Sequence, residues 1–155
     1  MAQATMNSTS YIVGLDVATK CGVAVVNQAS KKITTLVYNG TPAMQLESLV
    51  DLFGEDWNGI TVRIESLQTF RNAVTTRSLL TRTGYLAYSL EKFGAKIEYV
   101  SPSQARKNLG VKTKDEVHKL FSHVAGITND ETDAIAVATF GLTNNLEGWQ
   151  IERVI

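Results

Sequence analysis

The stretch that decides the fold is residues 11–27, which read YIVGLDVATKCGVAVVN. Two runs of apolar and β-branched residues, Ile12 to Val17 and Gly22 to Asn27, are separated by only four residues. A connection this short joins neighbouring antiparallel strands. A third run, Lys32 to Tyr38, follows another short link, so we predict three antiparallel strands in succession. Asp16 lies inside the first strand, where a carboxylate is costly unless something compensates its charge.

The rest of the chain alternates predicted helices and strands. They are a helix after Thr41-Pro42, a strand from Ile60 to Glu65, a helix from Asn72 to Phe93, a strand from Lys96 to Val100, and three short helices ending near Leu109, Val124 and Phe140. Connections of the β-α-β kind join parallel strands. We therefore predict an α/β fold with a mixed five-stranded sheet flanked by helices. The tail from Trp149 to Ile155 is predicted as a last extended piece.

Composition indicates one globular domain over residues 10–155. Apolar residues make up 44% of the chain and charged residues 19%, which argues against general disorder. Residues 1–9 are polar, lack the features of a signal peptide, and are expected to be a disordered tail. No apolar run is long enough to cross a bilayer. The single cysteine, Cys21, permits no disulfide within the chain, so we expect a reducing, cytoplasmic location and a packed thiol.

The net charge is zero, but the charges are unevenly distributed. Residues 71–119 hold ten Lys and Arg and four Asp and Glu, a local charge of +6. Residues 41–60 hold four acids and no base. A zero total can therefore hide a basic face, which is the electrostatic pattern of a protein that binds a phosphate backbone.

Three further acids accompany Asp16. Glu65 ends the predicted fourth strand, and Asp130 and Asp133 open a late apolar segment. Positions three apart on a helix share one side, and Thr128 with Glu131 forms a capping-box pattern that begins this helix. In a mixed sheet the four carboxylates can meet at one point. Charges buried at such cost predict a shared cation.

The segments around these acids resemble RuvC-type Holliday junction resolvases. Ile12-Val-Gly-Leu-Asp-Val-Ala-Thr-Lys-Cys-Gly is similar to the first-strand motif, and Arg63-Ile-Glu-Ser-Leu-Gln-Thr-Phe-Arg-Asn to the second acidic motif. Ser101-Pro-Ser-Gln-Ala-Arg-Lys, with Lys114-Asp-Glu-Val-His, resembles the basic segment. Asp130-Glu-Thr-Asp-Ala resembles the closing motif. The resemblance spans roughly residues 11 to 142.

The resemblance implies an RNase H-like (retroviral integrase-type) fold and a homodimer that cleaves branched DNA, four-way and possibly also three-way and flap. It implies two Mg²⁺ ions per active site, with Mn²⁺ as a substitute, held by Asp16, Glu65, Asp130 and Asp133. Lys114 corresponds to a family lysine near the scissile phosphate. The helix from Asn72 to Phe93 is the candidate dimer interface.

The same resemblance suggests which residues contact DNA. They are Gln68, Phe70, Arg71, Arg77, Arg106, Lys107 and Lys112, with Arg82 as a more generic cation. Gln68 stands where the family has a stacking aromatic residue, and Phe70 lies two positions further on. The basic segment between Arg106 and Lys114 is also shorter than in cellular resolvases. Both departures favour the short bacteriophage RuvC-like endonucleases, which act on a wider range of branched DNA.

Two alternatives stay open at the level of sequence. The first is an RNA-processing nuclease of the same fold, against which the Asp130-x-x-Asp133-Ala pattern argues. The second is an ATP-binding module of the actin and sugar-kinase type, whose first strand carries a similar Gly-x-Asp pattern. That fold needs a second phosphate loop and a duplicated domain, for which 155 residues are too few.

Overall fold

The computed structural model describes residues 11–66, 73–142 and 146–154. Its strands form one mixed sheet in the order β5-β4-β1-β2-β3-β6. The strands are β1 (Tyr11–Asp16), β2 (Lys20–Asn27), β3 (Lys32–Asn39), β4 (Thr61–Glu65), β5 (Lys96–Val100) and β6 (Gln150–Arg153). The pairs β1–β2 and β2–β3 are antiparallel, and β1–β4, β4–β5 and β3–β6 are parallel. The α/β prediction is confirmed.

One detail of the fold prediction is corrected: within the described residues the sheet has six strands, where five were predicted. The sixth strand, β6, lies within the tail predicted only as an extended piece and pairs with β3 from Lys32/Gln150 to Thr35/Arg153. Four residues with alternating exposure give too little periodicity to identify a strand. Its partner is the free edge of β3, which is more than a hundred residues away in sequence.

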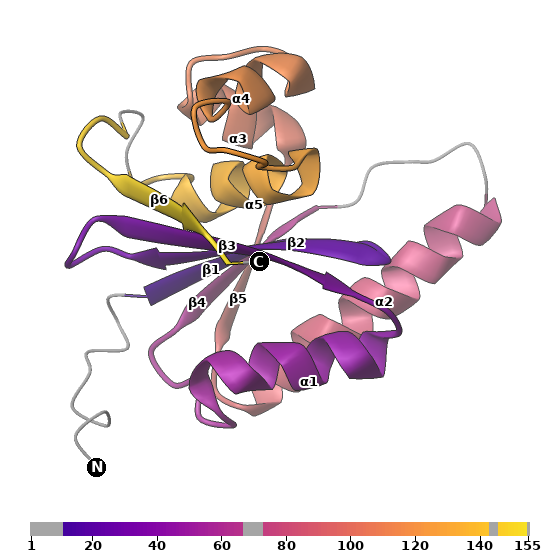
Figure 1. The fold of residues 1–155 in the computed structure, drawn as a ribbon. Coiled ribbons are helices and arrows are strands. Elements are labelled where there is room, and N and C mark those ends of the chain that lie inside the picture. Colours follow the sequence, from indigo (N-terminus) through magenta and orange to yellow (C-terminus); the bar gives the residue numbers. More distant parts are fainter. Residues whose placement is uncertain (1–10, 67–72, 143–145, 155) are drawn as a thin grey trace.

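Helices cover both faces of the sheet (Figure 1). On one face lie α1 (Pro42–Phe53) and α2 (Ala73–Lys92). On the other face α5 (Asn129–Thr139) packs on the sheet, and α3 (Pro102–Asn108) and α4 (Lys114–Leu120) pack on α5. No helix in the described ranges is long and apolar enough to cross a membrane.

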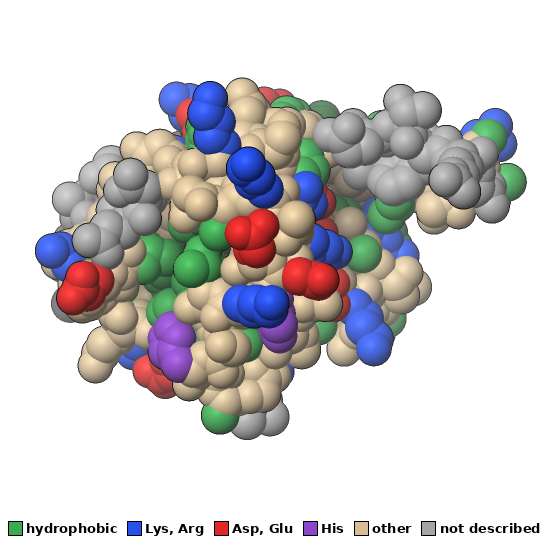
Figure 2. All heavy atoms as spheres, turned by 90° about the horizontal axis from the view of Figure 1, so that it is seen from above, with side chains coloured by type: hydrophobic (Ala, Val, Ile, Leu, Met, Phe, Trp, Pro, Cys, Tyr) green, Lys and Arg blue, Asp and Glu red, His purple; other side chains and the backbone are tan. Residues whose placement is uncertain are grey.

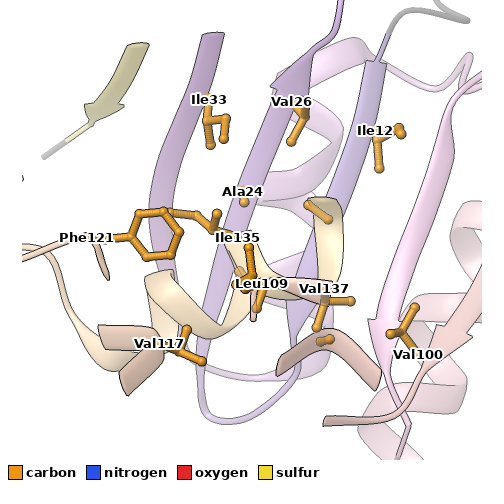
Figure 3. Close-up of a cluster of buried hydrophobic side chains, with 14 of the residues drawn as sticks. Ile12, Ala24, Val26, Ile33, Val100, Leu109, Val117, Phe121, Ile135 and Val137 are labelled. Carbon is orange, nitrogen blue, oxygen red and sulfur yellow. The ribbon is translucent and has the colours of Figure 1, made fainter. Parts of the chain in front are cut away.

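Each face of the sheet has its own apolar core. Figure 3 shows the core on the α5 side, where Ile12, Val26 and Ile33 from the strands meet Phe121 and Ile135 from the helical layer. The core on the α1 and α2 side is built on side chains of the alternate strand positions, such as Val13, Leu15, Val62 and Ile64. Because successive side chains of a strand point to opposite faces, the faces of all the other strand residues follow.

This alternation decides where the acids of the strands point. Val13 and Leu15 face α1 and α2, so Asp16 faces α5. Val62 and Ile64 also face α1 and α2, so Glu65 faces α5 as well. Both carboxylates therefore lie on the side of the sheet that α5 covers.

Candidate metal and nucleic-acid site

Asp16 and Glu65 come from the ends of two neighbouring parallel strands. The pairing of β1 with β4 runs from Ile12/Thr61 to Leu15/Ile64. Asp16 and Glu65 each follow this register by one residue. The carboxyl ends of parallel strands are where open α/β sheets commonly bind ligands.

Asp130 lies in the first turn of α5, and Asp133 follows three residues later at the start of the second turn. The predicted capping box is present: the Thr128 side chain accepts from the Glu131 backbone N–H, and the Glu131 side chain accepts from the Thr128 backbone N–H. This cap begins the helix at the point where two acids can face the sheet. Acids in a first turn are also favoured by the helix dipole.

Two glycines let α5 approach the sheet closely. A Cβ atom at Gly22 on β2 would lie 2.0 Å from the backbone oxygen of Asp130. A Cβ atom at Gly14 on β1 would lie 2.3 Å from the backbone oxygen of Ala134. Any larger residue would push the helix away, so these glycines set the distance between the α5 acids and Asp16 on the sheet.

The pKa of Asp16 indicates that the other three acids lie close enough to act on its charge. Burial raises its pKa to about 8, and the carboxylates of Glu65, Asp133 and Asp130 contribute in that order. Lys114 acts in the opposite direction. A carboxyl group surrounded by three others gives up its proton readily only if a cation is near.

Lys114 and Arg106 supply positive charge next to the acids. The Lys114 ammonium lies 3.0 Å from Oδ2 of Asp133, and this hydrogen bond raises the lysine pKa. Burial raises the pKa of both Glu65 and Asp133, while Lys114 and Arg106 oppose the shift. A small cleft lined by Glu65, Asp133 and Arg106 joins these groups.

The donor set fits a hard divalent cation held in part by other ligands. Among the described residues, no three acidic, histidine or cysteine side chains converge closely enough to hold a metal ion by themselves. Mg²⁺ usually binds one or two carboxylates and completes its shell with water and substrate phosphate, so a closed protein cage is not required. The oxygen-only chemistry of Asp16, Glu65, Asp130 and Asp133 suits that mode.

A basic cleft lies beside the acids. Ser103, Arg106, Lys107 and Lys112 line it together with Gly110 and Val111. Arg106 also lines the small cleft that contains Glu65 and Asp133, so one side chain forms part of the wall of both clefts. Figure 2 views the molecule from the side of α3 and α4, and there Asp and Glu side chains in the middle of the face have Lys and Arg side chains above them, below them and to their right. Opposite charges thus meet on this face, although the whole chain is neutral.

The other predicted DNA-contacting residues have different outcomes. Gln68, Phe70 and Arg71 lie outside the described residues. Arg77 is exposed on α2. Arg82, by contrast, donates from Nη1 to the Gly40 carbonyl and to Oε1 of Gln45, at 2.8 Å each, which gives it a structural role.

Sequence reasoning missed Gln45, which is fully buried on α1. Its Nε2 lies 2.8 Å from the Ala18 carbonyl and 3.1 Å from the Thr19 carbonyl. It therefore holds the β1–β2 turn that directly follows Asp16. The only signal in the sequence was a polar residue at an apolar helical phase, which is too common to single out.

Cys21, predicted as a packed residue, is buried, and burial raises its pKa to about 12.

The comparisons with known proteins concern the fold. No family model and no curated protein matches the chain. A structure of Thermus thermophilus RuvC in complex with a Holliday junction substrate matches with a TM-score of 0.60 and 17% identity, over 83% of this chain and 89% of that one. A second structure of T. thermophilus RuvC matches with a TM-score of 0.60 and 20% identity, over 83% and 90% of the two chains. Together with the mixed sheet and its helical layers, these likenesses show that this chain has the RuvC-type, RNase H-like fold.

Proposed function

We propose that this chain is a metal-dependent, structure-selective endonuclease that nicks branched DNA, including Holliday junctions, by two-metal phosphodiester hydrolysis. The observation that carries the proposal is the closeness of the Asp16, Glu65 and Asp133 carboxylates, which adds to burial in raising the pKa of Asp16 and Glu65. Lys114 forms an ion pair with Asp133, and a basic cleft lies beside this cluster. An acidic cluster that binds cations next to a basic surface that binds phosphate is what metal-assisted hydrolysis of a nucleic acid requires.

Asp16, Glu65, Asp130 and Asp133 would hold the Mg²⁺ or Mn²⁺ ions. Two such ions would supply an activated water and charge stabilisation for the leaving 3′ oxygen. Metal binding would also oppose the burial and the carboxylate repulsion that together raise the Asp16 pKa, because a cation favours the ionised carboxylates.

The basic residues would bring phosphate to this site. Lys107 and Lys112 are exposed and would bind the backbone without reading sequence. Lys114 and Arg106, which lie nearer the acids, would offset charge that develops on the scissile phosphate.

Branched DNA is the proposed substrate class. One of the matching T. thermophilus RuvC structures contains a Holliday junction substrate, and the same fold here carries acids at both strand ends and on α5. This supports the same class of substrate for this chain. The likeness to short bacteriophage enzymes, with their wider substrate range, stays a prediction from the sequence.

A homodimer is proposed with α2 as the interface. This helix exposes apolar and aromatic side chains along its length: Val74, Leu80, Tyr85 and Tyr88 are between 42% and 71% exposed. A two-fold substrate cut on two strands calls for two sites related by symmetry. Sedimentation of the wild type and of a Leu80→Glu/Tyr88→Glu variant tests this, and an unchanged dimer would exclude α2.

The central experiment compares cleavage of four-way, three-way, flap and linear DNA with Mg²⁺. We expect branched substrates to be nicked and Asp16→Asn to bind them without cutting. Glu47→Gln is the matched control, because it removes an exposed acid from α1 on the opposite face of the sheet. Cutting by Asp16→Asn would refute the metal site, and equal cutting of linear duplex would refute branch selectivity. Preferential cutting of structured RNA would favour the RNA-processing alternative, and calorimetric binding of ATP the kinase-like one.

A further inference from the structure

Glu131 lies between Asp130 and Asp133 in sequence but points in another direction. Its side chain is fully buried. As part of the capping box it accepts from the Thr128 backbone N–H at 3.1 Å and from the Thr128 hydroxyl at 2.9 Å. These bonds are local, since they stay within the first turn of α5 and the residue before it.

The same carboxylate also makes two long-range contacts, which a helix cap does not need. The Thr35 hydroxyl on β3 donates to Oε2 at 2.6 Å. Nε of Arg153 on β6 lies 2.9 Å from each carboxylate oxygen. Thr35 and Arg153 are opposite each other in the β3–β6 register, so one point on two adjacent strands holds the carboxylate.

The contacts of Glu131 determine the position of the first turn of α5 more than they stabilise the fold. A buried ion pair is a poor source of net stability, because desolvation of both charges opposes their attraction. It does fix geometry, because both carboxylate oxygens are bonded to groups on different elements. On the other side of the turn, the backbone of Asp130 rests on Gly22 of β2 without room for a Cβ atom. The first turn of α5 therefore cannot rotate or slide along the sheet without breaking these contacts.

We propose that Arg153 and Thr35 are positioning residues that act through Glu131, and that they fix the orientation in which Asp130 and Asp133 are presented to metal. The inference rests on the proposed function of these acids as ligands. The short edge strand β6 would then contribute to the site through Arg153, which bonds to Glu131 and not to the four acids themselves. Groups that hydrogen-bond metal ligands directly typically alter metal affinity or activity by about 10- to 100-fold when removed, and because Arg153 and Thr35 act one residue further out we expect the lower end of that range.

The test measures Mn²⁺ affinity of the metal-free protein by calorimetry and by electron paramagnetic resonance, without DNA. Arg153→Met removes the charge and the donor and keeps an apolar stem, and we expect about 10-fold weaker binding. Thr35→Val removes one hydroxyl at nearly constant shape and should weaken binding severalfold. Glu152→Gln is the matched control: it removes the 3.0 Å ion pair from Glu152 to Lys32, which joins β6 to β3 but not to α5. Its affinity should equal that of the wild type.

A double variant separates positioning from simple stability. Glu131→Met/Arg153→Met replaces both charges, so it leaves no uncompensated buried ion and should melt closer to the wild type than Arg153→Met does. Positioning predicts that its Mn²⁺ affinity stays about 10-fold weak despite the recovered stability. Affinity that recovers with stability, or an Arg153→Met variant that binds like the wild type, would overturn the inference and leave the proposed function intact. A wild type that binds no Mn²⁺ would overturn both.

Discussion

Asp16→Asn should stabilise the metal-free protein while it abolishes cleavage. Burial and three neighbouring carboxylates raise the pKa of Asp16 from 3.8 to about 8. At pH 7 the folded state therefore holds a proton on this group, whereas the unfolded state does not. Folding must take up that proton against its ordinary affinity, and asparagine removes this requirement.

The size of the effect follows from the pH and the two pKa values. Protonating Asp16 on folding costs free energy in proportion to how far the pH lies above the unfolded pKa of 3.8. At about 1.4 kcal/mol per pH unit, this cost is roughly 4 kcal/mol at pH 7. The buried amide keeps a desolvation cost of its own of about 1 kcal/mol or more. We therefore expect the free energy of unfolding to rise by about 3 kcal/mol in Asp16→Asn.

The sign of the pH dependence is fixed by the direction of the shift. Because the folded pKa lies above the unfolded one, the wild type binds more protons when folded, and its stability falls as pH rises from about 4 to about 8. The gain from Asp16→Asn should thus be near zero at pH 4 and largest at pH 8. Mg²⁺ should bind well only to the wild type and so stabilise it alone. At a concentration one hundred times the dissociation constant, Mg²⁺ should reduce the difference in free energy of unfolding between Asp16→Asn and the wild type by about 2.7 kcal/mol.

Urea denaturation in EDTA between pH 4 and pH 8, followed by circular dichroism, measures this difference. Glu47→Gln serves again as control and should shift stability by less than about 0.5 kcal/mol at every pH, since the side chain is exposed. An Asp16→Asn protein less stable than the wild type at pH 7, or a difference that does not change with pH, would refute the account of the acidic cluster.

Three further changes test separate parts of the molecule. Gly22→Ala places a Cβ atom 2.0 Å from the Asp130 oxygen, so thermal melting should show a loss of about 1–3 kcal/mol and cleavage should fall with it. Arg82→Met loses its bonds to Gln45 and Gly40, so stability should fall by about 1–3 kcal/mol while the salt dependence of junction binding stays unchanged. Lys107→Ala should leave melting unchanged and reduce the slope of log affinity against log salt by about 1, as filter binding across salt concentrations can measure.

Local patterns in the sequence were sufficient for most of the secondary structure. Hairpin spacing identified β1 to β3, and the capping box at Thr128 marked where α5 begins. These signals act between residues a few positions apart, so they survive without tertiary context. The strand β6 was missed as a strand because its only strong signal is its distant partner β3.

The candidate site divides in the same way. The sequence supplied the four acids and the basic residues around Arg106, because their spacing resembles a known pattern. It did not supply Gln45, which reaches the turn after Asp16 from α1, or Arg153, which reaches Glu131 from β6. Such residues have no local signature, since what they do depends on a partner brought near by the fold.

By itself, the sequence determined the order of the strands and helices from β1 to α5, the elements that carry the four acids, and the hidden basic segment. The tertiary structure decided that Asp16 and Glu65 share the face covered by α5, and how closely that helix approaches over Gly22. It also decided that Arg82 is held by Gln45 rather than left free on α2. The reason is physical: periodicity and capping are fixed over a few residues, whereas register, close packing and buried ion pairs depend on elements far apart in the chain.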